Sequence, residues 1–253
     1  MDKKRNALCA VLCALLAGVP AFAQQAEENS PVETTTVWKR GDNGYYMHRI
    51  PAIVCTTKGT LLAFAEGRKN GRGDHGDIDL VVKASTDMGK TWSDFILVHE
   101  EGDTKSIAIS NPVPVVDRKT GDIILLFRRT PEDRLFGGIF VTRSKDDGMT
   151  WSKPEDVSKS VLPDYSEKMA TGPGHGLQIK NGKHAGRLCI PTYVWNGKDE
   201  SSPYPWLRNV MVYSDDGGKT WTHGIPTDSD LNRSRRDLSY QIRGQSSAAA
   251  NSI

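Results

Sequence analysis

The chain of 253 residues has little of several features that mark particular classes of protein. It has only 4 Cys, and their spacing does not match a metal-ligand pattern. Its formal net charge is +2 and both signs are dispersed, so there is no charge footprint for nucleic acid or membrane surfaces. Beyond residue 23, no apolar run is long enough to span a bilayer, and no window shows sustained helical periodicity. We therefore expect no nucleic-acid partner, no transmembrane segment, no metal site and no cofactor.

Residues 1–23 have the organisation of a secretory signal. A positive start at Lys3, Lys4 and Arg5 is followed by an apolar run over 7–19 and an Ala-Phe-Ala pattern over 21–23. The apolar run is too short to cross a membrane. We expect a mature chain that begins near Gln24 and is exported to the periplasm, the cell surface or the extracellular space.

Two of the four cysteines, Cys9 and Cys13, lie inside this signal segment. Cys55 and Cys189 remain, each within an apolar run typical of a strand. An oxidising compartment would permit a disulfide between them. Two separate buried thiols are the preferred interpretation, because Cys is among the most buried residue types.

The octapeptide Ser-x-Asp-x-Gly-x-Thr-Trp occurs three times, beginning at Ser85, Ser144 and Ser214. The starts lie 59 and 70 residues apart, a period longer than one hairpin that indicates an array of multi-stranded units. In each copy the Asp can accept backbone hydrogen bonds within a tight turn, and the Gly permits a positive φ. The Trp then begins the next strand and can pack between units. We interpret the three aspartates as structural, at Asp87, Asp146 and Asp216.

Short apolar runs rich in β-branched and aromatic residues recur about every ten residues, separated by Gly, Asp, Asn and Pro, which predicts an all-β fold. The predicted strands are Arg49–Cys55, Thr60–Ala65, Ile78–Ala84, Phe95–His99, Pro112–Val116, Asp122–Phe127, Gly138–Thr142, Leu188–Val194 and Asn209–Tyr213. About four strands per repeat interval suit one blade of a β-propeller. A sandwich has similar strand counts but does not predict the repeated turn. Residues 24–36 are a linker or a first strand, and 37–231 are the propeller region.

The segment from His48 to Asp79 is the richest in residue types that carry chemistry. Arg49 stands inside an apolar strand, where a guanidinium is costly to bury unless it pairs with an anion. An arginine at a strand end that reaches solvent is the alternative. Glu66 and Arg68 end the second strand, and the Gly-rich loop that follows presents Asp74.

This segment resembles the opening of a known enzyme family. It reads Arg49-Ile50-Pro51, then Gly59-Thr60-Leu61-Leu62-Ala63-Phe64-Ala65-Glu66-Gly67-Arg68, then Gly76-Asp77-Ile78-Asp79-Leu80 and the first repeat. Similar segments follow in order at 111–112, 172–178 and 187–193. Over residues 37–231 the chain thus resembles the exo-α-sialidase (neuraminidase) family, whose repeats are called Asp-boxes. The resemblance implies a six-bladed, monomeric β-propeller with a central active site that releases terminal sialic acids from glycoproteins, glycolipids or oligosaccharides by a retaining mechanism.

The resemblance also assigns roles to individual residues. Arg49 resembles the first of three arginines that clamp the sialic acid carboxylate, which a guanidinium fork matches well. Arg68 resembles an arginine that lines the sugar pocket. Asp74 resembles the general acid/base, with Asp77 as the alternative. The remaining substrate-binding residues are Asn111, Tyr193 and Trp195, and for the two aromatic residues ordinary blade packing is the alternative interpretation.

Residues 232–253 are basic and polar and end in a low-complexity run, which predicts a divergent, disordered tail. The family's nucleophilic Tyr, its Glu partner and two further arginines normally follow the third Asp-box, and no tail residue stands in a recognisable motif. We therefore expect about three blades from a truncated or frameshifted product, poor folding and no measurable activity. A non-catalytic carbohydrate-binding or structural propeller fragment is the alternative, and the combination of Arg49, Arg68 and Asp74 favours the hydrolase lineage.

Overall fold

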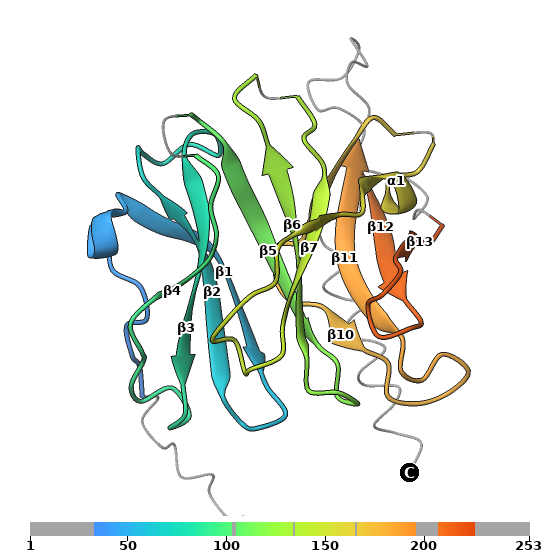
Figure 1. Ribbon diagram of the computed structural model, residues 1–253, viewed down its shortest axis with the longest axis horizontal. Helices are drawn as coiled ribbons and strands as arrows, with labels where there is room; N and C mark the ends of the chain where they lie inside the picture. Colours follow the sequence, from blue (N-terminus) through green and yellow to red (C-terminus); the bar gives the residue numbers. More distant parts are fainter. Residues whose placement is uncertain (1–32, 103–104, 134, 165, 196–206, 226–253) are drawn as a thin grey trace, which may run out of the picture. The chain divides into compact units, whose positions relative to one another are not determined.

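The computed structural model describes residues 33–102, 105–133, 135–164, 166–195 and 207–225 (Figure 1). The predicted signal segment and the predicted tail lie outside these residues. Every helix and strand belongs to the unit Thr35–Ile253. The elements are η1 (Asp42–Gly44), β1 (Met47–Cys55), β2 (Leu61–Arg68), β3 (Ile78–Ser85), β4 (Ile96–His99), β5 (Ala108–Val116), β6 (Ile123–Thr130), β7 (Ile139–Ser144), β8 (Glu155–Asp156), α1 (Ser158–Val161), β9 (Lys168–Thr171), β10 (Leu177–Gln178), β11 (Leu188–Trp195), β12 (Leu207–Ser214) and β13 (Thr222–His223).

The strands form three antiparallel blades that follow one another along the chain (Figure 1). Blade 1 is β1–β4, blade 2 is β5–β8, and blade 3 begins with β9 and β10, which both pair with β11 before β12 and β13. A single parallel bridge between Ile78 and Ala108 links blades 1 and 2 into one continuous sheet. The all-β propeller architecture predicted from the repeat is confirmed.

All nine predicted strands are present, with ends that differ by a few residues. The sequence analysis missed β8, β9, β10 and β13, which have only two to four residues each. Strands this short carry too few positions to show alternation, and both residues of β8 are exposed. Of the predicted linker or first strand, Glu33–Thr36 is described and contains no strand. Among the described residues, no helix is long and apolar enough to cross a membrane.

The middle blade buries both of its faces, as strand β6 illustrates. Ile124 and Leu126 belong to a core cluster shared with blade 3, whereas Ile123, Leu125 and Phe127 belong to a cluster shared with blade 1. Successive side chains of a strand point to opposite faces, so an uninterrupted apolar run is required where both faces are covered. The apolar contacts between blades therefore hold the described fold together.

Each Asp-box forms the turn between the third and fourth strands of its blade, as predicted. In the first box, the Thr91 amide and hydroxyl donate to the Asp87 carboxylate at 2.9 and 2.6 Å. The Ser85 hydroxyl donates to Asp87 at 2.8 Å and accepts from the Gly89 amide at 2.9 Å. Hydrogen bonds from Thr91 lower the pKa of Asp87 to about 2. The aspartates thus bind their own turns, which supports the structural interpretation.

The second and third boxes also join their blades to the preceding blade. A Cβ added to Gly148 would lie 2.8 Å from Cδ1 of Leu62 in β2, and one added to Gly218 would lie 2.7 Å from Cδ1 of Ile124 in β6. The Trp151 ring of the second box packs edge-on against Phe64 of blade 1, with centroids 5.7 Å apart. The prediction that the indole packs between neighbouring units is confirmed for Trp151 and for Trp221, which joins the core cluster shared by blades 2 and 3.

Cys55 and Cys189 are both free thiols, as preferred over a disulfide. The expectation that both are buried is wrong for Cys55, which is exposed at the end of β1. The apolar pattern of β1 indicated a strand, but it did not show which side of the strand's last residue is covered. Within the described ranges, no cluster of His, Cys, Asp and Glu has the geometry of a metal site.

Candidate active site

The first strands of blades 1 and 2 each contain a bulge with an unusual backbone conformation, and Gly172, between β9 and β10 of blade 3, has the same conformation. Ile50, Asn111 and Gly172 have φ values of 52°, 56° and 55°, and each precedes a proline. They recur at intervals of 61 residues, a second repeat that the sequence analysis did not identify. A positive φ at the β-branched Ile50 is strained, and such strain clusters at functional sites. Bulges re-aim side chains, and here they turn the inner strands toward one shared cavity.

This cavity of about 540 Å³ is lined by residues from all three blades. It contains every substrate-binding and catalytic residue predicted from the sequence: Arg49, Arg68, Asp74, Asn111, Tyr193 and Trp195. It also contains Glu66, Arg128 and Lys168, so four basic side chains face two carboxylates. The excess of positive charge suits an anionic ligand.

Arg49, in β1, reaches the loop between β2 and β3. Its guanidinium donates to the Asp74 carboxylate at 3.1 Å and to the Arg72 carbonyl at 3.2 Å. The side chain of Arg49 is 40% exposed, and that of Asp74 is 73% exposed. The sequence analysis expected an anionic partner for an arginine inside this apolar strand, and in the ligand-free protein Asp74 is that partner.

Arg68 is far more enclosed than a simple pocket-lining role requires. Its side chain is 2% exposed and pairs with Glu66 at 2.5 Å and with Asp74 at 2.8 Å. It also donates to the carbonyls of Arg72 and Gly73 at 2.6 and 2.7 Å. Arg68 therefore holds the loop that carries Asp74, in addition to reaching the cavity.

Glu66 connects blade 1 to the bulge of blade 2. One carboxylate oxygen accepts from the guanidinium of Arg68, and the other accepts from the Asn111 amide at 2.9 Å. Burial raises the pKa of Glu66, and the hydrogen bonds from Asn111 and Arg68 oppose this increase. The sequence analysis noted Glu66 only as an ion-capable partner of Arg68, because its contact with Asn111 spans 45 residues.

Asp77, the alternative acid/base, lies in a different environment. It is buried beside β3, and Lys69 Nζ lies 3.1 Å from its carboxylate and 3.2 Å from that of Asp79. Asp79 also accepts a hydrogen bond from the Tyr45 hydroxyl at 2.7 Å. Asp77 does not line the cavity that contains Asp74. The two candidates, three residues apart, thus face different parts of the protein.

The far side of the cavity is built from blades 2 and 3. The Asn111 side-chain amide donates to the Thr171 carbonyl at 2.9 Å, and the Thr171 hydroxyl donates back to the Asn111 carbonyl at 2.6 Å. Tyr193 and Trp195, both on β11, stack with ring centroids 5.5 Å apart. Both aromatic residues are only partly buried, so they form a platform in the cavity in addition to packing.

Arg128 is a cavity residue that the sequence analysis missed. Leu62 and Ile124 each meet the Asp-box glycine of the next blade, so they are equivalent in β2 and β6. Four residues further along these strands stand Glu66 and Arg128. The available signal was therefore a charged residue at the end of an apolar strand in two successive repeats.

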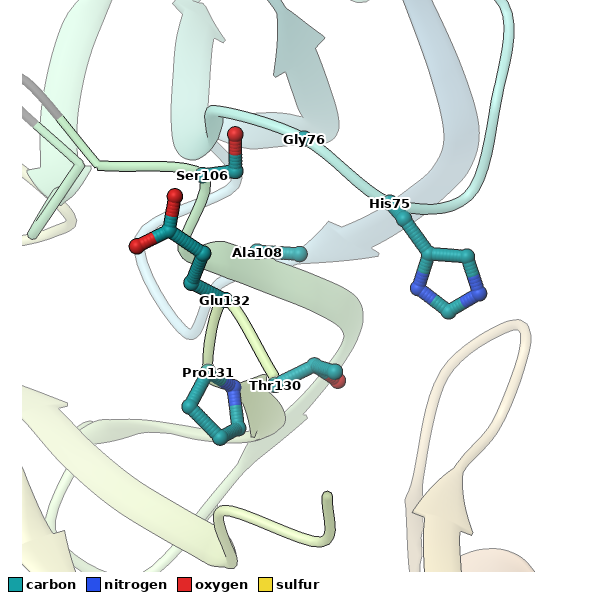
Figure 2. Close-up of a pocket in the computed structure, with 7 residues that line it drawn as sticks. All are labelled: His75, Gly76, Ser106, Ala108, Thr130, Pro131 and Glu132. Carbon is teal, nitrogen blue, oxygen red and sulfur yellow. The ribbon is translucent and has the colours of Figure 1, made fainter. Parts of the chain in front are cut away.

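A second, smaller cavity of about 190 Å³ lies beside the first (Figure 2). His75 lines both cavities, but its imidazole points away from Ser106 and Glu132, which line the smaller one (Figure 2). None of the predicted site residues lines the smaller cavity. The larger cavity is therefore the candidate active site.

Comparisons with known proteins agree with this geometry. Residues 59–249 match the BNR repeat-like domain family. The chain is 32% identical over 205 residues to an exo-alpha-sialidase of Arthroderma benhamiae, covering 71% of this chain and 45% of the relative. It is 32% identical over 200 residues to a sialidase of Micromonospora viridifaciens, covering 73% and 30%. The chain thus spans less than half the length of these relatives.

Solved structures show the same fold. The Hadza microbial sialidase Hz136 superposes with a TM-score of 0.67 and 27% identity, covering 76% of this chain and 40% of that one. A leech intramolecular trans-sialidase superposes with a TM-score of 0.64 at 18% identity, covering 78% and 46%, which bears on the fold alone. The chain therefore belongs to the BNR repeat-like family, and its relatives in sequence and in fold are sialidases.

Proposed function

We propose that this chain carries part of the active site of an exo-α-sialidase, which removes terminal sialic acids from glycoconjugates by a retaining mechanism. One observation carries the proposal: Arg49 and Asp74 lie 3.1 Å apart in a cavity whose far wall is an aromatic pair. A cation for a carboxylate, a carboxyl for proton transfer and a platform for a sugar ring are three of the groups that this reaction uses, beside a nucleophile.

Arg49 binds the substrate carboxylate in this proposal. The guanidinium is always charged and presents a planar fork that matches a carboxylate. In the ligand-free protein Asp74 occupies one of its donors, so an arriving substrate replaces one carboxylate with another. This exchange releases Asp74 toward the glycosidic oxygen, which is attached to the same carbon as the substrate carboxylate.

Asp74 acts as the general acid and then as the general base. The nucleophile, which the resemblance assigns to a Tyr beyond the third Asp-box, bonds to the anomeric carbon as the bond from that carbon to the glycosidic oxygen breaks, and the protonated Asp74 carboxyl donates its proton to the departing oxygen. The resulting carboxylate then accepts a proton from the water that attacks the anomeric carbon and displaces the nucleophile. Asp74 is suited to this role by its exposure and its place in the cavity, whereas Asp77 is buried against Lys69.

Arg68 positions Asp74, and the remaining residues hold the sugar. The contacts of Arg68 to the Arg72 and Gly73 carbonyls fix the loop immediately before Asp74. Asn111, Tyr193 and Trp195 bind the acylamino side of the ring and its side chain. The side-chain oxygen of Asn111 makes no hydrogen bond with a described residue and can accept from an amide N–H.

Release of a fluorescent alcohol from a sialoside by a full-length protein that contains this chain tests the proposal. Arg49→Ala should lower kcat/KM about 100-fold or more, because one of the carboxylate's charge-assisted contacts is lost. Arg118→Ala, an exposed arginine outside the cavity, is the matched control and should leave kcat/KM within about twofold of the parent protein. Binding of sialosides without turnover would instead favour a non-catalytic carbohydrate-binding propeller.

We also propose that the protein is exported and monomeric. The charged start, apolar run and Ala-Phe-Ala pattern of residues 1–23 support export. N-terminal sequencing of the protein from cell fractions should find a chain that begins near Gln24 outside the cytoplasm. An intact Met1 on the active protein would contradict the proposal, and light scattering of the same sample measures its oligomeric state.

A further inference from the structure

Arg128 is a charged side chain of the cavity that the mechanism above does not use. It stands near the end of β6, where alternation places it on the same face as Ile124 and Leu126, toward blade 3. Its guanidinium carbon lies 5.1 Å from the centroid of the Trp195 ring. Arg128 of blade 2 thus places a positive charge beside the aromatic side chain of Trp195 from blade 3.

The guanidinium of Arg128 lacks the partners that neighbouring arginines have. Its Nε is buried and has no hydrogen-bond partner among the described residues. Arg129, the next residue, points to the opposite face and pairs with Glu101 at 2.6 Å. A carboxylate pairs with each of five other described arginines: Arg49, Arg68, Arg129, Arg143 and Arg187. Arg128 is therefore a partly buried cation that lines the cavity and forms no ion pair with either of the cavity's two carboxylates, Glu66 and Asp74.

This arrangement costs stability in the ligand-free protein. Burial lowers the pKa of Arg128, because removal of the charged guanidinium from water is unfavourable. The Trp195 ring face offsets part of that cost through a cation–π contact but supplies no hydrogen-bond acceptor. A ligand with oxygen acceptors would satisfy the free donors.

The position of Arg128 identifies which part of a sialoside it meets. The carboxylate and the glycosidic oxygen share one carbon, so both lie at the end of the cavity formed by Arg49 and Asp74. The opposite end of the sugar carries the acylamino group and a side chain of three hydroxylated carbons. Tyr193, Trp195 and Arg128 line the part of the cavity contributed by blades 2 and 3. With the carboxylate bound at Arg49, the proposed function directs that end of the sugar toward these three side chains.

We propose that Arg128 is a specificity-determining residue that donates hydrogen bonds to the hydroxyl oxygens of the sugar's three-carbon side chain. This inference rests on the proposed sialidase function. A guanidinium has donors only, arranged in a rigid fork that can bridge two neighbouring hydroxyl oxygens. The stacked rings of Tyr193 and Trp195 supply an apolar surface for the carbon atoms of the same side chain.

Two substrates that differ only in this side chain test the inference. One is a fluorogenic sialoside, and the other is the same compound with its side chain shortened to one carbon by periodate oxidation and reduction. In a full-length protein that contains this chain, Arg128→Met should lower kcat/KM for the complete sialoside about 10- to 100-fold. For the shortened sialoside, which keeps only the first of the three side-chain hydroxyl groups, the same substitution should change kcat/KM less than about threefold, because the guanidinium fork can no longer bridge two neighbouring oxygens.

Arg128→Lys and Arg118→Met complete the design. Lysine keeps the charge but loses the fork, so Arg128→Lys should retain part of the preference for the complete side chain. If Arg128→Met does not fold, the kcat/KM values of Arg128→Lys on the two substrates still test the inference. Arg118→Met removes an exposed arginine outside the cavity and should leave both substrates unaffected.

Three results would overturn the inference in distinguishable ways. If Arg128→Met reduced kcat/KM equally for the two substrates while Arg128→Lys, which keeps the charge, retained the parent's kcat/KM for both, Arg128 would act only through the general charge of the cavity. If the parent protein bound and cleaved neither sialoside, the proposed function itself would fail. If the parent cleaved both while Arg128→Met remained as active as the parent on each, the sialidase function would stand and the side-chain contact would not.

Discussion

At the scale of single residues, position relative to the cavity distinguishes two aspartates that the sequence alone offers as candidates for the general acid/base. Asp74 and Asp77 stand three residues apart in one Gly-rich loop region. Asp74 is exposed beside two guanidinium groups, and Asp77 is buried beside Lys69. A carboxyl that exchanges protons with a substrate must reach it, so only Asp74 is suitably placed.

Removal of the Asp74 carboxyl should therefore affect substrates according to their leaving groups. In a full-length protein that contains this chain, Asp74→Ala should reduce turnover of a sialyl-lactose at least about tenfold more than turnover of a sialoside with an acidic phenol leaving group. The phenol departs without full protonation, so it depends less on a general acid. Initial rates under saturating substrate measure the difference.

Asp94→Ala, at an exposed position outside the cavity, serves as the control for this experiment and should leave both rates unchanged. An equal loss on both substrates after Asp74→Ala would show that Asp74 does not supply the proton. A selective loss after Asp77→Ala would transfer the role to that residue.

At the scale of elements, the Asp-box is both a turn and a contact between blades. Gly89 and Gly148 occupy the same position in two boxes, with φ values of 87° and 89°. A Cβ on Gly89 would find its nearest neighbour at 3.6 Å, whereas a Cβ on Gly148 would lie 2.8 Å from buried Leu62. A side chain at either glycine would therefore meet the same unfavourable positive φ, but only at Gly148 would it also clash with a buried neighbour.

Gly148→Ala should for this reason destabilise the protein more than Gly89→Ala. The backbone cost is common to both substitutions, and overpacking against Leu62 adds about 1–3 kcal/mol to the loss in free energy of unfolding at Gly148. Urea unfolding followed by tryptophan fluorescence measures both variants against the parent. Equal losses would show that the second box does not pack tightly on blade 1.

At the scale of the whole molecule, the aspartates of all three Asp-boxes have lowered pKa values, so each box should lose stability as the pH falls. Hydrogen bonds from Thr91 lower the pKa of Asp87 to about 2. Burial works against the shift at Asp216, where hydrogen bonds from Thr220 nonetheless lower the pKa to about 2. A lowered folded-state pKa stabilises the fold above the unfolded value and loses that contribution as pH falls toward the folded value.

The free energy of unfolding should accordingly fall as pH decreases from 3.8, the ordinary pKa of an aspartate, toward about 2. The double variant Asp87→Asn/Asp216→Asn should have a lower free energy of unfolding than the parent above pH 3.8. Its free energy of unfolding should also fall less steeply than the parent's as the pH decreases through this range. Urea unfolding at a series of pH values compares the two slopes. Parallel curves for parent and variant would show that these carboxylates do not contribute to the acid sensitivity.

The sequence by itself determined the local conformations of this protein. Short apolar runs rich in β-branched and aromatic residues marked nine strands, and the fixed spacing of Asp, Gly and Trp marked each turn, because these signals arise within a few neighbouring residues. The resemblance carried by Arg49-Ile50-Pro51 and the following motifs identified six residues that the structure brings to one cavity. The short strands β8, β9, β10 and β13 were not predicted, because they owe their conformation to pairing with a longer neighbour.

Only the tertiary structure decided which of these residues face one another. It paired Arg49 with Asp74, buried Asp77 away from the cavity, and connected Glu66 to Asn111 across two blades. It also placed Arg128 over Trp195, 67 residues later in the chain. Such contacts depend on how blades pack and on which side of each strand is covered. No local pattern in the sequence encodes that choice, because burial is a property of the assembled core.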